Sequence, residues 1–171
     1  MRERNGIDYH TAAWRALISL TALDAEFVGL GMGGWPVISR RLAIEGVIRP
    51  EAADGADILW AFGTLIGNSD MHSGNLSFIS EHDRPYDIAP AYDMTPMTFA
   101  PRSGGGLPDN IPDANINASV GNETWRRAEK LACTFLARVV AEPRISHRFK
   151  PCIAALVRHI ETASAKIGRL G

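Results

Sequence analysis

The most restrictive feature of the sequence is an apolar run, DGADILWAFGTLIGN, between Asp54 and Asn68. Its large apolar residues fall on nearly every side of a helical wheel, and they include Ile58, Leu59, Phe62, Leu65 and Ile66. A helix that is apolar nearly all round has to be buried in a core. Asp54 is the predicted N-cap, with Asp57 in the first turn. Gly67-Asn68 is the predicted stop, because both residues tolerate the left-handed conformation.

The residues after this helix predict a tight loop and a small β-hairpin. The loop, GNSDMHSGN, is followed by a short strand, LSFIS, a turn, EHDRP, and a second extended piece, YDIAPAYD, which Pro90 interrupts. Residues 94–121 contain four prolines and the triplet Gly104 to Gly106. An irregular stretch of that length in a compact domain is usually functional or mobile.

Helical patterns flank this central part of the chain. The N-terminal segment YHTAAWRALISLTAL predicts a helix with Trp14, Leu17 and Ile18 on one side, and a short helix closed by Pro50 follows a glycine-rich loop. Residues 122–167 predict two amphipathic helices, the first capped by Asn122 and the second with Pro151 in its first turns. We therefore expect a mainly α fold with one small hairpin, forming a single domain over residues 1–171.

Composition narrows the classes of function. The net charge of −1 does not favour nucleic acid or an anionic membrane as the main partner. No run of about 18 apolar residues predicts a membrane span, and the N-terminus lacks the apolar region of a secretory signal. A cytoplasmic protein is the default expectation. Cys133 and Cys152 are then interpreted as buried thiols in a reducing compartment.

Three polar residues of the loop and hairpin indicate a candidate metal-binding and catalytic site. Asp70 follows the buried helix, Asn75 precedes the first strand, and Asp93 follows the second. The start of one strand of a hairpin lies beside the end of the other, so Asn75 and Asp93 should approach each other near Asp70. Carboxylate and amide oxygens suit Mg²⁺, which leaves positions open for water and phosphate. A separate Asp beside them can act as the base, as it does in protein kinases.

Other interpretations of the same residues stay open. Asn, Ser, Asp and Gly are ordinary turn residues, so the loop could be a polar turn without chemistry. A metal-dependent phosphohydrolase using Asp70, His72 and Asp93 would need further ligands, for which Asp83 and Asp87 are the nearest candidates. The segment GLGMGG fits the G-x-G-x-x-G pattern, but the residues before it look helical, so we interpret it as a flexible connector.

The central motifs resemble a known family. IGNSDMHSGNLSF followed by YDIAPAYDMTP is similar to the catalytic segment of HipA-like serine/threonine kinases, the toxins of toxin–antitoxin modules. The resemblance implies a kinase-like C-terminal lobe with the catalytic loop at 67–78 and the metal-binding end of the hairpin at 86–96. It implies Asp70 as base, Asn75 and Asp93 as ligands of the Mg²⁺ that accompanies ATP, and His72 as a residue that shapes the loop around the cofactor.

The sequence departs from the family pattern in the positions of its lysines. Its only lysines are Lys130, Lys150 and Lys166, so none precedes Asp70. HipA-like kinases cover ATP with an N-terminal lobe that carries a lysine, and we expect this lobe to be absent. Transfer of the ATP γ-phosphate to a protein Ser or Thr is then expected to be weak. The expected partners are a protein substrate, a HipB-like antitoxin or a complementary N-terminal lobe. The alternative is a non-catalytic subunit that binds another protein.

Overall fold

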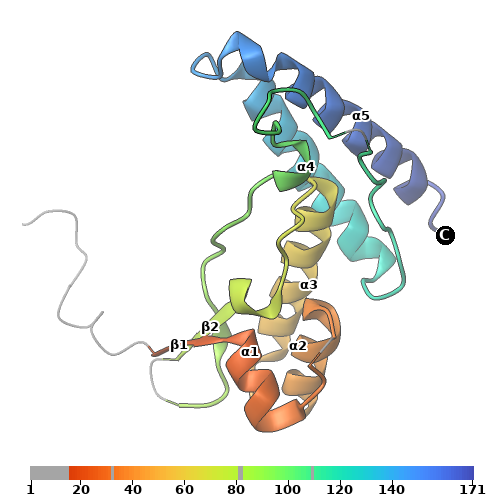
Figure 1. Cartoon of the computed structure of the whole chain (residues 1–171). Coiled ribbons are helices and arrows are strands. Elements are labelled where there is room, and N and C mark those ends of the chain that lie inside the picture. Colours follow the sequence, from red (N-terminus) through yellow and green to blue (C-terminus); the bar gives the residue numbers. More distant parts are fainter. Residues whose placement is uncertain (1–15, 32, 81–82, 109) are drawn as a thin grey trace, which may run out of the picture.

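One long helix lies at the centre of the molecule (Figure 1). The computed structural model describes residues 16–31, 33–80, 83–108 and 110–171. The central helix α3 (Pro50–Leu65) packs against α2 (Trp35–Ile44) near its start. Further along it packs against α4 (Asn122–Ala141), which runs beside α5 (Lys150–Ile167). The predicted buried helix and the two C-terminal helices are therefore confirmed.

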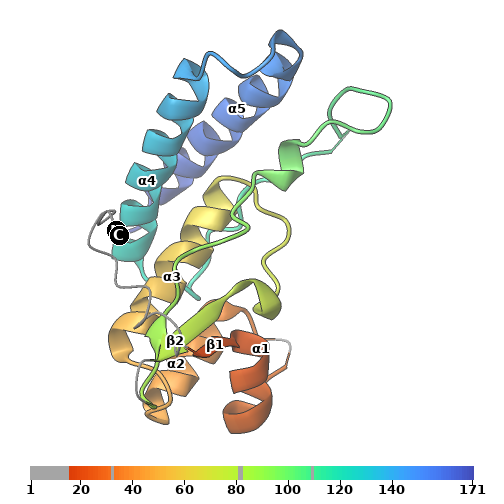
Figure 2. The same cartoon turned by 90° about the vertical axis from the view of Figure 1, so that its left-hand side faces the viewer.

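A small antiparallel sheet lies beside α2 and the first half of α3 (Figure 2). Its strands β1 (Ala16–Ser19), β2 (Ser77–Ser80) and β3 (Asp87–Ile88) follow the order β1-β2-β3. Phe78 of β2 pairs with Ile18 on one side and with Ile88 on the other. The predicted hairpin is thus confirmed, and it has a third strand that sequence analysis did not anticipate.

The predicted N-terminal helix is wrong over residues 16–19, which form β1. A helix, α1 (Leu20–Leu23), begins directly after the strand, where the hydroxyl of Ser19 accepts a hydrogen bond from the amide of Ala22. The apolar residues of this segment form a strand that pairs with β2. Their partner lies about 60 positions away, so no local pattern predicts the pairing. The other residues of that prediction, 9–15 with Trp14, lie outside the described part of the chain.

The start of α3 also differs from the prediction. The helix begins at Pro50 with Arg49 as its N-cap residue, so Asp54 is not a cap but an exposed residue of the second turn. Pro50 opens this helix and does not close the one before it, since α2 ends at Ile44. Proline suits the first helical position because its φ is already helical and an amide there lacks a helical partner.

Asp57 does not belong to the first turn either, and its buried carboxylate forms an ion pair with the half-exposed Arg40. Arg40 of α2 donates to its carboxylate and to the carbonyl of Ser119, which joins α2, α3 and the loop before α4. Burial raises the pKa of the Asp57 carboxyl, and the neighbouring Arg40 only partly opposes this. The ion pair therefore ties three parts of the chain together at a desolvation cost.

The apolar core has two parts that share α3. The first half of α3 packs with α1, α2 and β2 around a buried set that includes Leu20, Trp35, Ile38, Leu42 and Phe78. The second half packs with α4 and α5 around Leu65, Trp125, Leu156, Ile160 and Ile167. Because α3 belongs to both parts, its C-terminal end is held firmly where the loop of interest begins.

The C-terminal helices largely follow their predicted pattern. Gly121 is the N-cap residue of α4, one position before the predicted Asn122, and Pro151 lies in the first turn of α5 as expected. The cysteine prediction is wrong in part, because Cys133 is exposed on α4 and Cys152 is only half-buried. None of the helices in the described ranges combines the length and the apolar character that a membrane crossing requires.

Gly67 is expected to tolerate no side chain. Its φ is +69°, and a Cβ there would lie 2.5 Å from Cε2 of the Phe99 ring. We expect Gly67→Ala to lower the free energy of unfolding by about 2–4 kcal/mol, since it adds overpacking to a left-handed backbone. Gly46→Ala is the matched control, with φ +67° but open space around the new Cβ. Urea unfolding should give the control a loss of about 1–2 kcal/mol. Equal losses would mean that the Phe99 contact has no role.

Candidate active site

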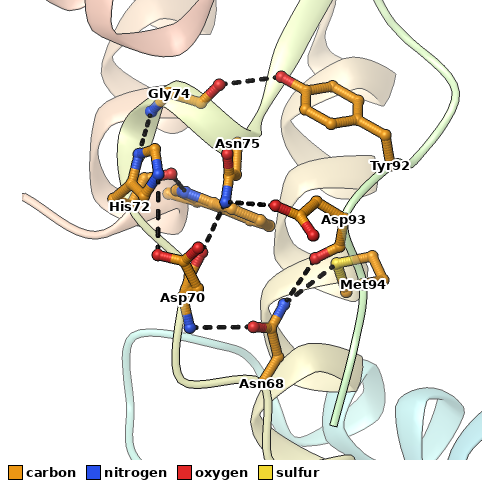
Figure 3. A network of polar contacts seen from close by, with 9 residues as sticks. Asn68, Asp70, His72, Gly74, Asn75, Tyr92, Asp93 and Met94 are labelled. Carbon is orange, nitrogen blue, oxygen red and sulfur yellow. Dashed lines mark hydrogen bonds and ion pairs between the residues drawn. The ribbon is translucent and has the colours of Figure 1, made fainter. Parts of the chain in front are cut away.

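The candidate site is built on the loop that connects α3 to β2 (Figure 3). Gly67, with its left-handed backbone, ends the helix, and the amide of Asn68 donates to the carbonyl of Gly63 at 2.8 Å. The loop then closes with a 3₁₀ turn over Ser73–Asn75 before the strand begins. The glycine and the turn reverse the chain within a few residues, as the turn-forming sequence predicts.

Asn75 connects the loop to the far end of the hairpin. Its amide nitrogen donates to the carbonyl of Asp70 at 2.9 Å and to a carboxylate oxygen of Asp93 at 3.3 Å. The hairpin thus brings Asn75 and Asp93 together, with Asp70 beside them, as the strand geometry predicted. Both carboxylates are exposed, and no Arg or Lys pairs with either of them in the described part of the chain.

Asn68 holds the backbones of the two aspartates. Its side-chain oxygen accepts from the amide of Asp70 at 2.9 Å, and its side-chain nitrogen donates to the carbonyl of Asp93 at 3.3 Å. Asn68 is buried, so these bonds are shielded from water. Asp93 has φ +52°, an uncommon conformation for a non-glycine residue. The contact from Asn68 therefore lies where the backbone of Asp93 needs support.

His72 makes a hydrogen bond that shapes the loop. Its Nδ1 accepts from the amide of Gly74 at 3.0 Å, so in the neutral ring the proton resides on Nε2. Nε2 lies 3.8 Å from a carboxylate oxygen of Asp70, which is longer than a hydrogen bond. The carbonyl of His72 accepts from the indole nitrogen of Trp35 at 2.9 Å. The loop is therefore tied both to itself and to α2.

Tyr92 connects the end of the hairpin to the loop through two hydrogen bonds of its hydroxyl group. Its hydroxyl donates to the carbonyl of Gly74 at 2.9 Å and shares a hydrogen bond of 2.7 Å with the hydroxyl of Ser77. Gly74 directly precedes Asn75, and Tyr92 directly precedes Asp93. The tyrosine therefore holds the two candidate ligand residues in register from positions next to them.

The donor set fits Mg²⁺ in type and number. Asp93 offers a carboxylate and Asn75 an amide, and Mg²⁺ commonly takes one or two protein ligands with water and phosphate oxygens completing its shell. Asn75 turns its nitrogen toward Asp93. Binding a metal through its oxygen would require the amide to rotate by about half a turn and to release the carbonyl of Asp70.

Comparison with known proteins identifies the family. The family described as HipA-like C-terminal domain matches residues 50–163, which include the candidate site and the helices around it. The chain belongs to this family. The chain is also 36% identical over 155 residues to a protein named Toxin YjjJ from Escherichia coli (strain K12). That alignment covers 91% of this chain and 34% of the E. coli protein. The chain therefore spans about a third of that relative.

Two residues of the HipA-like domain were missed as site residues in the sequence. The sequence pattern indicates Asn68 only as a helix terminator and Tyr92 only as part of an extended segment. Asn68 comes two positions before Asp70, and Tyr92 one position before Asp93, so proximity in sequence was the available signal. Their hydrogen-bond partners lie up to 25 positions away, which the local pattern could not reveal.

The phosphohydrolase hypothesis gains no support from the HipA-like domain. Among the residues that the structure describes, no group of three or more His, Cys, Asp or Glu side chains is placed to hold a metal ion. Asp87, one of the spare ligand candidates, pairs with Arg49 at 2.9 Å. Asp83 lies in the turn at the opposite end of the hairpin from Asp93.

The glycine-rich segment, residues 29–34, precedes the matched residues and is a connector fixed by hydrogen bonds. The carboxylate of buried Asp24 accepts from the amides of Leu30 and Gly31 at 2.9 and 2.7 Å. The residues directly before the segment are helical, as predicted, and not a strand. Met32, inside the segment, lies outside the described residues.

Proposed function

We propose that this chain is the catalytic lobe of a HipA-like serine/threonine protein kinase. Asp70 is the base, and Asn75 and Asp93 hold the Mg²⁺ that accompanies ATP. The observation that carries the proposal is the double contact of Asn75, which joins the Asp70 carbonyl at 2.9 Å and the Asp93 carboxylate at 3.3 Å. Family membership supports it independently.

The proposed chemistry follows from the roles of these groups. In the transfer, a hydroxyl oxygen of the protein substrate forms a bond to the γ-phosphorus of ATP. The bond between that phosphorus and the bridging oxygen breaks, and ADP leaves. Asp70 is exposed and has no Arg or Lys partner among the described residues, so it is free to orient the hydroxyl and accept its proton. When bound, Mg²⁺ neutralises charge on the phosphates.

His72 and Asn68 would act on the site through its geometry. The hydrogen bond from Gly74 to His72 shapes the turn that precedes Asn75, and Asn68 sets the backbones of Asp70 and Asp93. Preorganised groups lose little energy to rearrangement during the reaction, so both residues should support the rate without touching the transferred phosphate.

The partners of the domain follow from the same proposal. The E. coli relative is named a toxin, and we infer that an antitoxin of the HipB type can bind the protein that carries this domain. No lysine precedes Asp70 in this sequence, so the ATP-covering lobe is proposed as a further partner region. The 171-residue chain by itself is expected to bind ATP weakly and to transfer phosphate slowly.

Label transfer from γ-labelled ATP tests the role of Asp70. The chain is incubated with Mg²⁺, total cell protein as acceptor and, in a second arm, a protein that carries the ATP-covering lobe. We expect Asp70→Asn to reduce the wild-type transfer by about 100-fold or more, because the amide cannot accept the proton. Asp83→Asn, at the opposite end of the hairpin, is the matched control and should retain the wild-type rate.

Two outcomes would contradict the proposal. Transfer that persists in Asp70→Asn would exclude Asp70 as the base. An absence of transfer in both arms, together with an absence of metal binding at Asp93, would favour the alternative of a non-catalytic subunit. That alternative requires an exposed apolar face near α3. Leu17 and Tyr92 are exposed at the sheet, but no large apolar side chain of α3 is strongly exposed in the structure.

A further inference from the structure

An apolar pocket lies between the segment after Asp93, the connection from α4 to α5 and the start of α5. This part of the chain is at the opposite end of α3 from the sheet (Figures 1 and 2). The pocket has a volume of about 440 Å³ and a lining that is almost entirely apolar. Its wall includes Met97, Ile145, Phe149, Ile153 and Leu156. Such a volume is within the range of about 300–1,000 Å³ that is usual for binding sites.

The fold leaves this apolar surface open to water. Leu156 is buried, but Phe149 and Met97 at the mouth of the pocket are 46% and 50% exposed. Phe149 is the residue directly before α5, at the end of the 3₁₀ turn His147–Phe149. Apolar side chains around an open hollow favour an apolar group that displaces the water.

The stretch of chain that forms one side of this pocket is rich in positive charge. Residues 138–150 contain Arg138, Arg144, Arg148 and Lys150 against a single acid, Glu142, which gives this short stretch a net charge of +3 while the whole chain has −1. Glu142 is neutralised within the stretch, because Arg144 bonds both of its oxygens at 2.7 and 2.9 Å and holds the pKa of its carboxyl below the usual range.

Three of these cations are available to a ligand. Arg138, Arg148 and Lys150 are exposed, and none has an acidic partner among the residues that the structure describes. Each is next in sequence to a residue of the pocket wall, either Val139 or Phe149. We call Arg138, Arg148 and Lys150 the basic rim of the pocket. An apolar pocket with such cations beside it is complementary to a ligand that has an apolar group between negative charges.

We propose that this pocket is the docking site for an acidic segment of a partner protein. The segment inserts one aromatic or aliphatic side chain against Phe149 and Leu156 and places carboxylates near Arg148 and Lys150. The pocket wall includes Thr95, two residues after Asp93, so the docked partner lies beside the segment that leads to the candidate site. The proposal does not depend on phosphate transfer.

Cys152 provides a direct reporter, since it lines the pocket, while exposed Cys133 is an internal control outside it. The probe is a 12-residue peptide of Glu and Ser with one central Phe. Iodoacetamide alkylation of each cysteine is followed by mass spectrometry. At a peptide concentration ten times the dissociation constant, the rate at Cys152 should fall about tenfold, because about one pocket in eleven stays free. The rate at Cys133 should not change.

Control peptides separate the two parts of the proposal. Replacing Phe by Ser, or every Glu by Lys, should abolish the protection of Cys152. The proposal is overturned if the acidic Phe peptide gives no protection, or if the control peptides protect equally well. Protection by decanoate but not by the peptide would also overturn it, in favour of a fatty-acid ligand.

Charge reversal tests the rim without disturbing the core. The double variant Arg148→Glu, Lys150→Glu should bind the acidic peptide about tenfold more weakly and should gain affinity for the Lys peptide. The double variant Arg127→Glu, Lys130→Glu, at exposed positions in the first half of α4, is the control matched in charge and should leave both affinities unchanged. Equal losses in the two variants would mean that only the net charge of the chain matters, which would contradict the proposed rim.

Discussion

Replacing Asp93 by Asn is expected to weaken the binding of Mn²⁺, used as a probe for Mg²⁺, by about 100-fold or more. The two side chains have almost the same shape, but the variant loses the charged oxygen ligand that a hard cation prefers. Electron paramagnetic resonance counts free Mn²⁺, and NMR line broadening locates the bound ion. Broadening should centre on the amides of residues 68–76 and 93–94, around the hydrogen bond from Asn75 to Asp93.

Two further variants show whether the loss of Mn²⁺ binding is specific to Asp93. Asp87→Asn is a control on the same hairpin, because Asp87 is engaged by Arg49, and its affinity for Mn²⁺ should equal that of the wild type. Asp70→Asn should change the affinity by less than about threefold, since a base beside the metal is not a ligand. If Asp70→Asn removes binding as fully as Asp93→Asn does, Asp70 is a ligand and the division of roles proposed for the kinase is wrong.

Replacing Trp125 by Ala is expected to lower the free energy of unfolding by about 3–5 kcal/mol. Its side chain is fully buried between α3, α4 and α5, and its indole nitrogen donates to the carbonyl of Asn117 at 3.0 Å. Alanine would leave both a cavity and an unpaired carbonyl in the loop that precedes α4. Urea unfolding measured by circular dichroism checks the loss.

A surface position on the same helix provides the control for Trp125. Leu131 of α4 is 50% exposed, so Leu131→Ala should change the free energy of unfolding by less than about 0.5 kcal/mol. Trp125→Phe separates packing from hydrogen bonding, since it restores most of the volume but not the donor. Similar losses for Trp125→Ala and Leu131→Ala would contradict the position of Trp125 in the core.

Local signals in the sequence were sufficient for the centre of the site. The apolar run to Ile66 predicts a buried helix, Gly67 predicts its end, and the alternating residues after Asn75 predict a strand. Each of these signals consists of consecutive residues, because the backbone conformation it predicts depends mainly on neighbours along the chain. For the same reason the approach of Asn75 to Asp93 could be predicted, because a short hairpin determines it.

Errors arose where a distant partner decides the local structure. Residues 16–19 look helical by period, yet they form β1 because β2 offers an unpaired edge. The error at Asp54 has a local cause instead, because Pro50 already begins the helix four residues earlier. Periodicity describes which face is apolar, but it does not say which element will cover that face.

The sequence by itself therefore determined the family, the order of helix, loop and hairpin, and the residues of the candidate site, because these depend on neighbours along the chain. Only the tertiary structure decided that Asn68 and Tyr92 hold the two aspartates in place, and that Phe149 lines an open pocket with a basic rim. Hydrogen bonds and burial are satisfied by whichever group is near in space, and that group is often far away in sequence.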